Sequence, residues 1–193
     1  MSKKKLILAS GSPRRKQLLE AIGISFSVQT ADTKEDYPAG LPVMEIPVHI
    51  ATAKAVAVAK LGNDHNIVLA ADTIVALEGQ VLGKPSDAEQ ARTFLKLLSG
   101  KTHEVITGVC LFYDGQPHSV AVKTDVHFVE LTAAQINYYI TRYNPLDKAG
   151  AYGIQEWIGM VGIDSIQGDY YNVMGLPVNT VNKALQALGL SAV

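Results

Sequence analysis

The sequence has little of several features that mark whole classes of protein. The single cysteine, Cys110, excludes a disulfide framework within these 193 residues, and the five histidines show no spacing typical of metal ligands. No apolar run approaches the roughly 18 residues of a membrane span. The run Leu6–Ala9 after the N-terminal lysines is also shorter than the roughly 7–15 apolar residues of a signal peptide. We therefore expect a cytoplasmic protein.

The chain also has almost no excess of positive or negative charge. Seventeen Lys and Arg residues balance 18 Asp and Glu residues to a net charge of −1, so no overall basic field favours stable binding to nucleic acid or membranes.

Two familiar nucleotide-binding motifs are missing. Gly100-Lys101-Thr102 resembles the end of a Walker loop, but Leu95 stands where that loop needs glycine, and no G-x-G-x-x-G follows a strand. Any phosphate binding must come from a local cluster of another kind.

The apolar runs, turns and capping signals predict an α/β protein with a mixed sheet. The run 157–163 reads as a strand, and Asp114-Gly115 as a hairpin turn between two strands. A capping box is expected at Ser86–Glu89 and another at Thr132–Gln135. Strands are expected at residues 5–9, 25–30, 67–77, 103–113, 118–129 and 157–163, and helices at 13–22, 47–61, 86–100, 132–142 and 177–188.

The segment Ser10–Lys16 joins a strand to a helix that begins at Pro13 with Ser12 as its cap. Three cations in the first turn of a helix oppose its dipole, and a bound anion would remove this conflict. The free N–H groups, two hydroxyls and two guanidinium groups would then contact one phosphate chain. The alternative is an ordinary capped turn with solvated basic residues.

Asp72 follows the apolar run Ile67–Ala71, where a carboxylate is costly unless it is paired, hydrogen-bonded or bound to metal. Asp72 could instead cap a turn. The acidic loop near it offers Asp32, Glu35 and Asp36, which could simply be solvated. One of these carboxylates beside Asp72 would make the oxygen site that Mg²⁺ prefers.

Two lysines could extend this site. Lys54 has apolar neighbours three and four residues away on its helix, so it either snorkels to solvent or contacts a polyphosphate. Lys84 is held between Gly83 and Pro85 and could act in the same way. The segment Asp147–Gln155 has two glycines that permit close approach of a ligand, although a surface Lys–Asp pair in a flexible loop explains it equally well.

With these motifs placed, the whole chain resembles the Maf family of septum-formation-inhibitor-like proteins. Residues 8–15 (LASGSPRR) match its opening motif, and Lys54 falls on its helix lysine. The other matches are 71–73 (ADT), 83–85 (GKP), 147–152 (DKAGAY) and 175–177 (GLP).

The resemblance implies one domain over residues 1–193, with two lobes around a central cleft and a curved mixed sheet, similar to inosine triphosphate pyrophosphatases. It also implies hydrolysis of a nucleoside triphosphate to monophosphate and pyrophosphate with Mg²⁺ or Mn²⁺. Asp72 is similar to the family's proton acceptor, and Glu35 to its acidic metal-site residue. Residues 151–155 (AYGIQ) resemble the branch that acts on dTTP and UTP. There Arg14, Thr73 and Gln155 are linked to base choice.

These expectations combine into one mechanism. Glu35 and Asp72 hold the metal, a water attacks the α-phosphorus with help from Asp72, and cationic and hydroxyl groups neutralise the leaving pyrophosphate. The expected phosphate-binding residues are Ser10, Ser12, Arg14, Arg15, Lys54 and Lys84. Two alternatives remain: the same chemistry on a methylated guanine or modified pyrimidine nucleotide, or a nucleotide-binding regulator of cell division. A homodimer is compatible with either.

Overall fold

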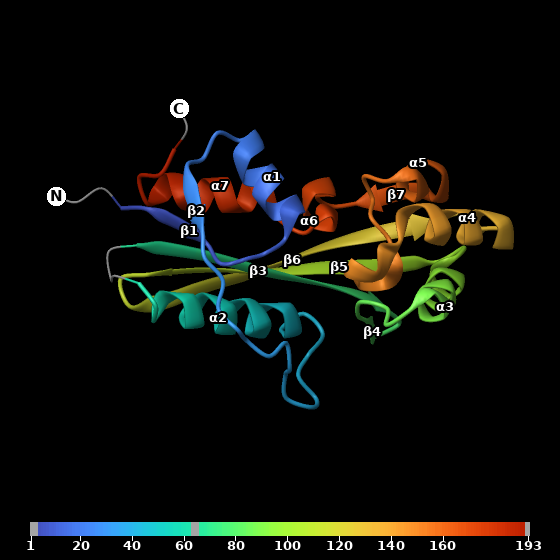
Figure 1. Ribbon diagram of the computed structural model, residues 1–193, viewed down its shortest axis with the longest axis horizontal. Coiled ribbons are helices and arrows are strands. Elements are labelled where there is room, and N and C mark those ends of the chain that lie inside the picture. Colours follow the sequence, from blue (N-terminus) through green and yellow to red (C-terminus); the bar gives the residue numbers. More distant parts are fainter. Residues whose placement is uncertain (1–3, 63–65, 192–193) are drawn as a thin grey trace. The chain divides into compact units, whose positions relative to one another are not determined.

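The computed structural model describes residues 4–62 and 66–191, and the chain forms a mixed α/β fold around one seven-stranded sheet (Figure 1). The strand order is β2-β1-β3-β5-β6-β7, with β4 paired to β3. Among the described residues, no helix is both long and apolar enough to cross a membrane. The strands are β1 Leu6–Leu8, β2 Phe26–Val28, β3 Ile67–Leu77, β4 Gln80–Leu82, β5 Thr102–Tyr113, β6 Gln116–Phe128 and β7 Ile163–Gln167. The α-helices are α1 Pro13–Ala21, α2 Ile46–Ala59, α3 Ala88–Leu98, α4 Ala133–Tyr143, α5 Trp157–Gly162, α6 Tyr170–Met174 and α7 Val178–Ala187. The expected mixed sheet with flanking helices is confirmed.

The chain divides into two compact units. Unit 1 comprises residues 1–72, 107–122 and 175–193, and unit 2 comprises residues 73–106 and 123–174. The three long strands β3, β5 and β6 contribute residues to both units.

In unit 1, β1 pairs in parallel with β2 and with β3. Helix α2 covers one face of these strands, and α1 and α7 cover the other (Figure 1). The α2 side has a core of small residues, in which Ala51, Ala55 and Val58 pack with Val68 and Ala70 of β3. Small side chains let this helix lie close to the sheet.

One glycine fixes how closely α2 approaches β5. A Cβ at Gly108 would lie 2.2 Å from the carbonyl carbon of Pro47 and 2.3 Å from the nitrogen of Val48. Only glycine leaves room for the helix backbone at this point. The first turn of α2 is thereby held against the sheet, and the position of Lys54 farther along the helix follows from it.

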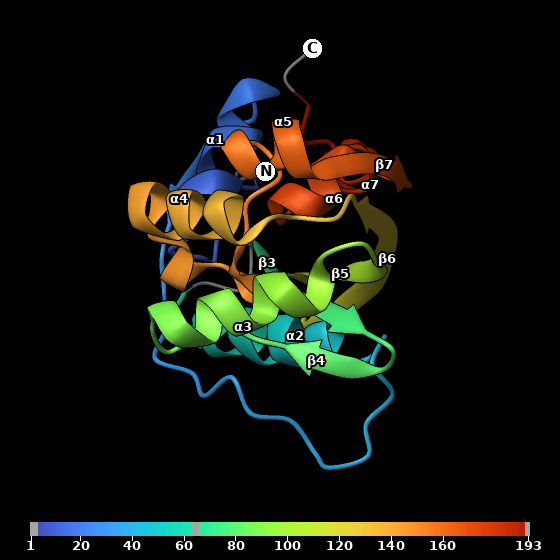
Figure 2. The same ribbon diagram turned by 90° about the vertical axis from the view of Figure 1, so that its right-hand side faces the viewer.

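Unit 2 has its own apolar core, in which Phe128, Tyr139 and Leu95 are fully buried. Helices α3 and α4 pack against each other in this unit (Figure 2). The Thr132–Gln135 capping box at the start of α4 is confirmed. The box expected at Ser86–Glu89 is wrong: Asp87 is the N-cap and accepts from the Gln90 N–H, and the Gln90 side chain accepts from the Ser86 N–H rather than from the N-cap.

The predicted strand at 157–163 is wrong. Residues Trp157–Gly162 form helix α5, and β7 begins only at Ile163. The apolar content is that of a buried strand, but Gly159 allows a helical turn to close on the Ile154 carbonyl, since a Cβ there would lie 1.8 Å from that oxygen. The sequence also gave no prediction of β4 or α6. Short 3₁₀ turns occur at Pro145–Asp147 and Ala149–Ala151, between α4 and α5, where the sequence predicted neither a helix nor a strand.

Candidate functional site

The start of α1 gathers hydroxyl and guanidinium groups around Ser10. Nη1 of Arg15 donates to Oγ of Ser10 at 3.1 Å, and the N–H of Ser12 donates to the same oxygen at 3.3 Å. Ser12 is the N-cap residue as predicted, but its hydroxyl makes no capping hydrogen bond, and the first turn contains no acidic residue. This helix start therefore presents uncompensated positive charge, which favours an anion.

Arg15 is held from the opposite side by a residue far along the chain. Its Nε donates to the carbonyl of Gly175 at 2.8 Å. Gly175-Leu176-Pro177 stood out in the sequence only as a matched motif, and the structure shows that its first residue orients a guanidinium group. Burial lowers the pKa of Arg15 from its ordinary value, and the neighbouring Arg14 lowers it further, while Asp72 and Glu35 act in the opposite direction. An arginine stays protonated despite such a shift.

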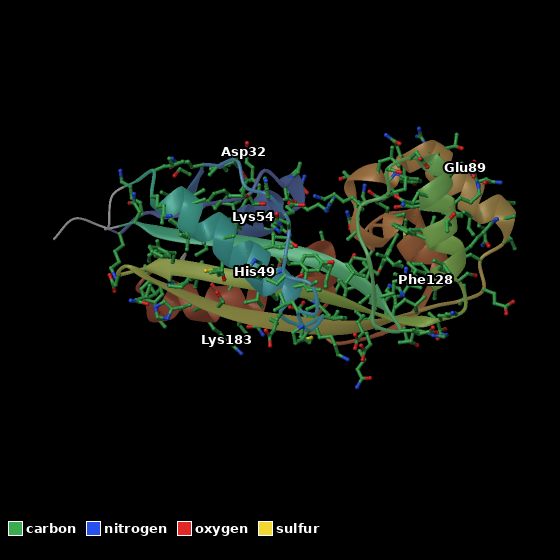
Figure 3. The ribbon with its side chains drawn as sticks, turned by 90° about the horizontal axis from the view of Figure 1, so that it is seen from below. Asp32, His49, Lys54, Glu89, Phe128 and Lys183 are labelled. Atoms are coloured by element: carbon green, nitrogen blue, oxygen red, sulfur yellow. The ribbon has the colours of Figure 1, made fainter. Side chains whose placement is uncertain are left out.

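Lys54 joins the two predicted carboxylates in unit 1. Its Nζ lies 2.6 Å from Oε1 of Glu35 and 2.8 Å from Oδ1 of Asp72. The side chains of Lys54 and Asp72 are only 16% and 12% exposed, so water screens this pair weakly, whereas Glu35 is 47% exposed. Of the two readings of Lys54, snorkelling to solvent is therefore wrong. Figure 3 labels Lys54 on α2, together with Asp32 of the loop before it.

The periodicities of β3 and α2 explain why these groups meet. Side chains alternate along a strand, so Asp72 lies on the same face of β3 as Val68 and Ala70, the face that packs on α2. On α2, Lys54 comes directly before the buried Ala55. The apolar contact between α2 and β3 is thus followed, farther along β3, by the charged contact between Lys54 and Asp72. Asp32 and Asp36, the other acidic candidates, are exposed.

These residues fit a divalent cation of the magnesium type. Two carboxylates already converge on one cationic nitrogen, and Mg²⁺ in proteins uses one or two carboxylates and takes its other ligands from water and phosphate oxygens. Within residues 4–62 and 66–191, no three His, Cys, Asp or Glu side chains are grouped to hold a metal. A metal here would therefore take its remaining ligands from water, and from phosphate oxygens when a substrate is bound.

The remaining predicted site residues belong to unit 2. Thr73 follows Asp72 directly and is partly buried, and Lys84 is exposed. Gln155 is half-buried, and its Oε1 is buried without a hydrogen-bond partner among the described residues. A buried acceptor left in this state costs about 1–3 kcal/mol.

Unit 2 also contains a polar network that the sequence did not predict. Lys148 is buried, and its Nζ lies 2.7 Å from Asp147 and 3.2 Å from Glu156. The Lys–Asp pair considered from the sequence is thus present, but its lysine is buried rather than at the surface. The Tyr139 hydroxyl donates to Glu156. One sequence signal could have indicated this network: Glu156 stands directly before an apolar run. Nearby, burial lowers the pKa of His103 to about 4, and its Nε2 lies 2.7 Å from the Tyr152 hydroxyl.

The start of α1 carries cationic groups, and two carboxylates that share a cation lie close to it. This combination defines a class of site suited to a polyphosphate and a divalent metal. Comparison of the chain with known families places it within a particular one. Residues 5–188 match the family of Maf-like proteins, and the chain belongs to that family.

Individual relatives agree with this assignment. A dTTP/UTP pyrophosphatase of Phocaeicola vulgatus is 50% identical over 97% of this chain and 98% of its own length. One of Cytophaga hutchinsonii is 51% identical over 95% and 84%. Among solved structures, the Ham1 protein of Staphylococcus aureus aligns over 64% of this chain and 70% of its own, at 16% identity and a TM-score of 0.45.

Proposed function

We propose that this protein hydrolyses dTTP and UTP to the nucleoside monophosphate and pyrophosphate, acting on the cytoplasmic nucleotide pool. Near-full-length relatives named dTTP/UTP pyrophosphatase support this substrate class. The structural observation that carries the proposal is the double contact of Lys54 with Glu35 and Asp72. It combines a cation for phosphate with two carboxylates for metal and proton transfer.

The triphosphate is held by hydrogen-bond donors, several of which also carry positive charge. In unit 1, the N–H groups at the start of α1, the hydroxyls of Ser10 and Ser12, and the cations Arg14, Arg15 and Lys54 bind phosphate oxygens. In unit 2, Lys84 has the same role. Gly175 fixes the direction of the Arg15 guanidinium, so this group is positioned before substrate binds.

Asp72 accepts the proton of the attacking water. The water oxygen bonds to the α-phosphorus, the bond from that phosphorus to the α–β bridging oxygen breaks, and pyrophosphate leaves with the bridging oxygen. Lys54 orients the Asp72 carboxylate through its 2.8 Å hydrogen bond and offsets charge that moves onto the leaving group. Glu35 and Asp72 would hold Mg²⁺ or Mn²⁺, which supplies positive charge to the phosphates and lowers the pKa of bound water.

Gln155 reads the base. Thymine and uracil present an N3–H donor between two carbonyls, and the buried Oε1 of Gln155 is an acceptor that such a donor satisfies. Cytosine has no N–H at that position. An amide could turn over to suit cytosine, so Arg14, which can only donate, and Thr73 complete the discrimination against an amino group.

The direct test is a turnover assay of the purified protein with Mg²⁺ on dTTP, UTP, CTP, the purine triphosphates and a methylated GTP. We expect pyrophosphate from dTTP and UTP at least tenfold faster than from CTP, as one or more unpaired buried polar groups would produce. In ¹⁸O-water, the label should enter the monophosphate. Label in pyrophosphate would contradict attack at the α-phosphorus, and preference for a purine would contradict the base assignment.

A further inference from the structure

The turn Gly153–Glu156, which carries Gln155, is tied at both ends to one hydroxyl group. The N–H of Gly153 donates to Oη of Tyr139 at 3.0 Å, and the same hydroxyl donates to Oε2 of Glu156. The turn is closed by the Glu156 N–H, which donates to the Gly153 carbonyl at 3.0 Å. Tyr139 is fully buried on α4. Burial and the Glu156 carboxylate raise the pKa of Tyr139, so its hydroxyl keeps the proton that it donates.

Glu156 is also held from a second side. It is the N-cap residue of α5, yet its side chain makes no capping hydrogen bond to the helix. Its Oε1 lies 3.2 Å from Nζ of Lys148 instead. The side chains of Lys148 and Glu156 are 9% and 19% exposed, so the pair is largely removed from water. A buried ion pair is weak support for stability, since apolar residues of similar volume often stabilise as well or better. What an ion pair and a shared hydroxyl add is a single defined geometry.

The side chains of this network meet at the α-carbon of Gly153. A Cβ at Gly153 would lie 3.1 Å from Cδ of Glu156, 3.2 Å from Cε of Lys148 and 3.2 Å from Nε2 of Gln155. The Gln155 amide therefore shares one small space with the two charged side chains. Because Gly153 has no Cβ, all three fit there. A shift of Glu156 or Lys148 would change the space open to the Gln155 amide.

We propose that Tyr139 and Glu156 are positioning residues for base selection: they hold the Gly153–Glu156 turn so that the Gln155 amide faces the base in one orientation. This rests on the proposed role of Gln155 in reading the base. Fixing the amide matters because a carboxamide that turns over suits cytosine as well as thymine or uracil. Loss of the Tyr139 hydroxyl frees the Gly153 end of the turn and loosens Glu156 at once.

The test measures the ratio of kcat/KM for dTTP to that for CTP in Tyr139→Phe, Glu156→Gln and Gln155→Ala, and in Tyr139→Phe combined with Gln155→Ala. Tyr138→Phe is the matched control, since Tyr138 is the next residue of α4 but is exposed. Ile136→Val controls for stability alone, because it removes one buried methylene group from α4 and leaves the Tyr139 hydroxyl and Glu156 in place.

We expect Tyr139→Phe and Glu156→Gln to lower the dTTP:CTP ratio about 5- to 10-fold, and both controls to leave it unchanged. In the Gln155→Ala background, Tyr139→Phe should have no further effect on the ratio, because its effect passes through Gln155. If Gln155→Ala collapses the ratio while Tyr139→Phe and Glu156→Gln keep it, the positioning role is overturned and base reading stands. Equal effects of Tyr139→Phe in both backgrounds overturn the positioning role too. A ratio unchanged by Gln155→Ala overturns base reading and the positioning role together.

Discussion

Nζ of Lys54 lies 2.8 Å from Oδ1 of Asp72, and this contact joins helix α2 to strand β3 where their apolar contact ends. Asp72 is buried, whereas the other partner of Lys54, Glu35, lies in an exposed loop. The lysine thus connects a buried carboxylate with a more exposed one. Both the phosphate-binding and the proton-accepting roles proposed for this site depend on that arrangement.

Replacing Asp72 by Asn keeps the volume of the side chain and its hydrogen bond from Lys54 but removes the proton acceptor. We expect a folded protein whose kcat falls by about 10²–10⁴. Turnover of dTTP and circular dichroism together check this. Asp164→Asn, at an exposed position of β7, is the matched control and should keep full activity. A folded Asp72→Asn protein with near-normal kcat would remove Asp72 from the chemistry.

Replacing Lys54 by Met leaves two carboxylates without the cation that they share. We expect the free energy of unfolding at pH 7 to fall by about 1–3 kcal/mol, since Asp72 is buried, and kcat/KM for dTTP to fall as well. Lys183→Met on α7, whose lysine is exposed (Figure 3), should change neither.

A double-mutant cycle then separates the Lys54–Asp72 pair from its surroundings. In the Lys54→Met background, Asp72→Asn should restore part of the lost stability, because it removes an unpaired buried charge. Urea unfolding of the four proteins gives the coupling free energy. Additive effects would mean that the 2.8 Å contact contributes nothing to stability.

Divalent metal should stabilise the protein without any nucleotide, if Glu35 and Asp72 hold it. At a free Mg²⁺ or Mn²⁺ concentration 100 times Kd, the expected gain is about 2.7 kcal/mol, seen as a rise in Tm. Glu35→Gln and Asp72→Asn should each reduce this rise, while Asp164→Asn should keep it. The same metal-induced rise in all four proteins would place the cation elsewhere.

His103 makes stability depend on pH. Its folded pKa of about 4 lies below the ordinary value of 6.5, so between these pH values the unfolded chain binds a proton that the folded chain does not. Stability from this residue is full above pH 6.5 and falls as the pH is lowered toward 4, by up to about 3 kcal/mol. His103→Gln should flatten the dependence of unfolding free energy on pH in that window. His49→Gln, at an exposed position of α2, should retain the slope of the parent protein. Equal slopes for both variants would show that His103 is not the group responsible.

The sequence was most informative where structure follows from neighbouring residues. Strand β3 has the predicted bounds Ile67–Leu77, and the Thr132–Gln135 capping box and the Asp114-Gly115 turn lie where they were expected. Each is set by side chains a few residues apart. By contrast, Trp157–Gly162 is as apolar as a buried strand but forms a helix, in which Gly159 lies close against the Ile154 carbonyl.

In the candidate site, too, some features follow from neighbouring residues and others only from the fold. Sequence patterns were sufficient to identify the residues with unusual chemistry: a basic helix start at Ser10–Lys16, a carboxylate at the end of an apolar run at Asp72, and a lysine on an apolar helix face at Lys54. The partners of these residues follow from the fold, because they come from distant parts of the chain. Arg15 and Gly175 are 160 residues apart in the chain, and Lys54 contacts Glu35 and Asp72 across 19 and 18 residues. Such contacts depend on how helices and strands pack against one another. Burial strengthens the attraction between opposite charges, but local sequence patterns do not encode which distant group will share that burial.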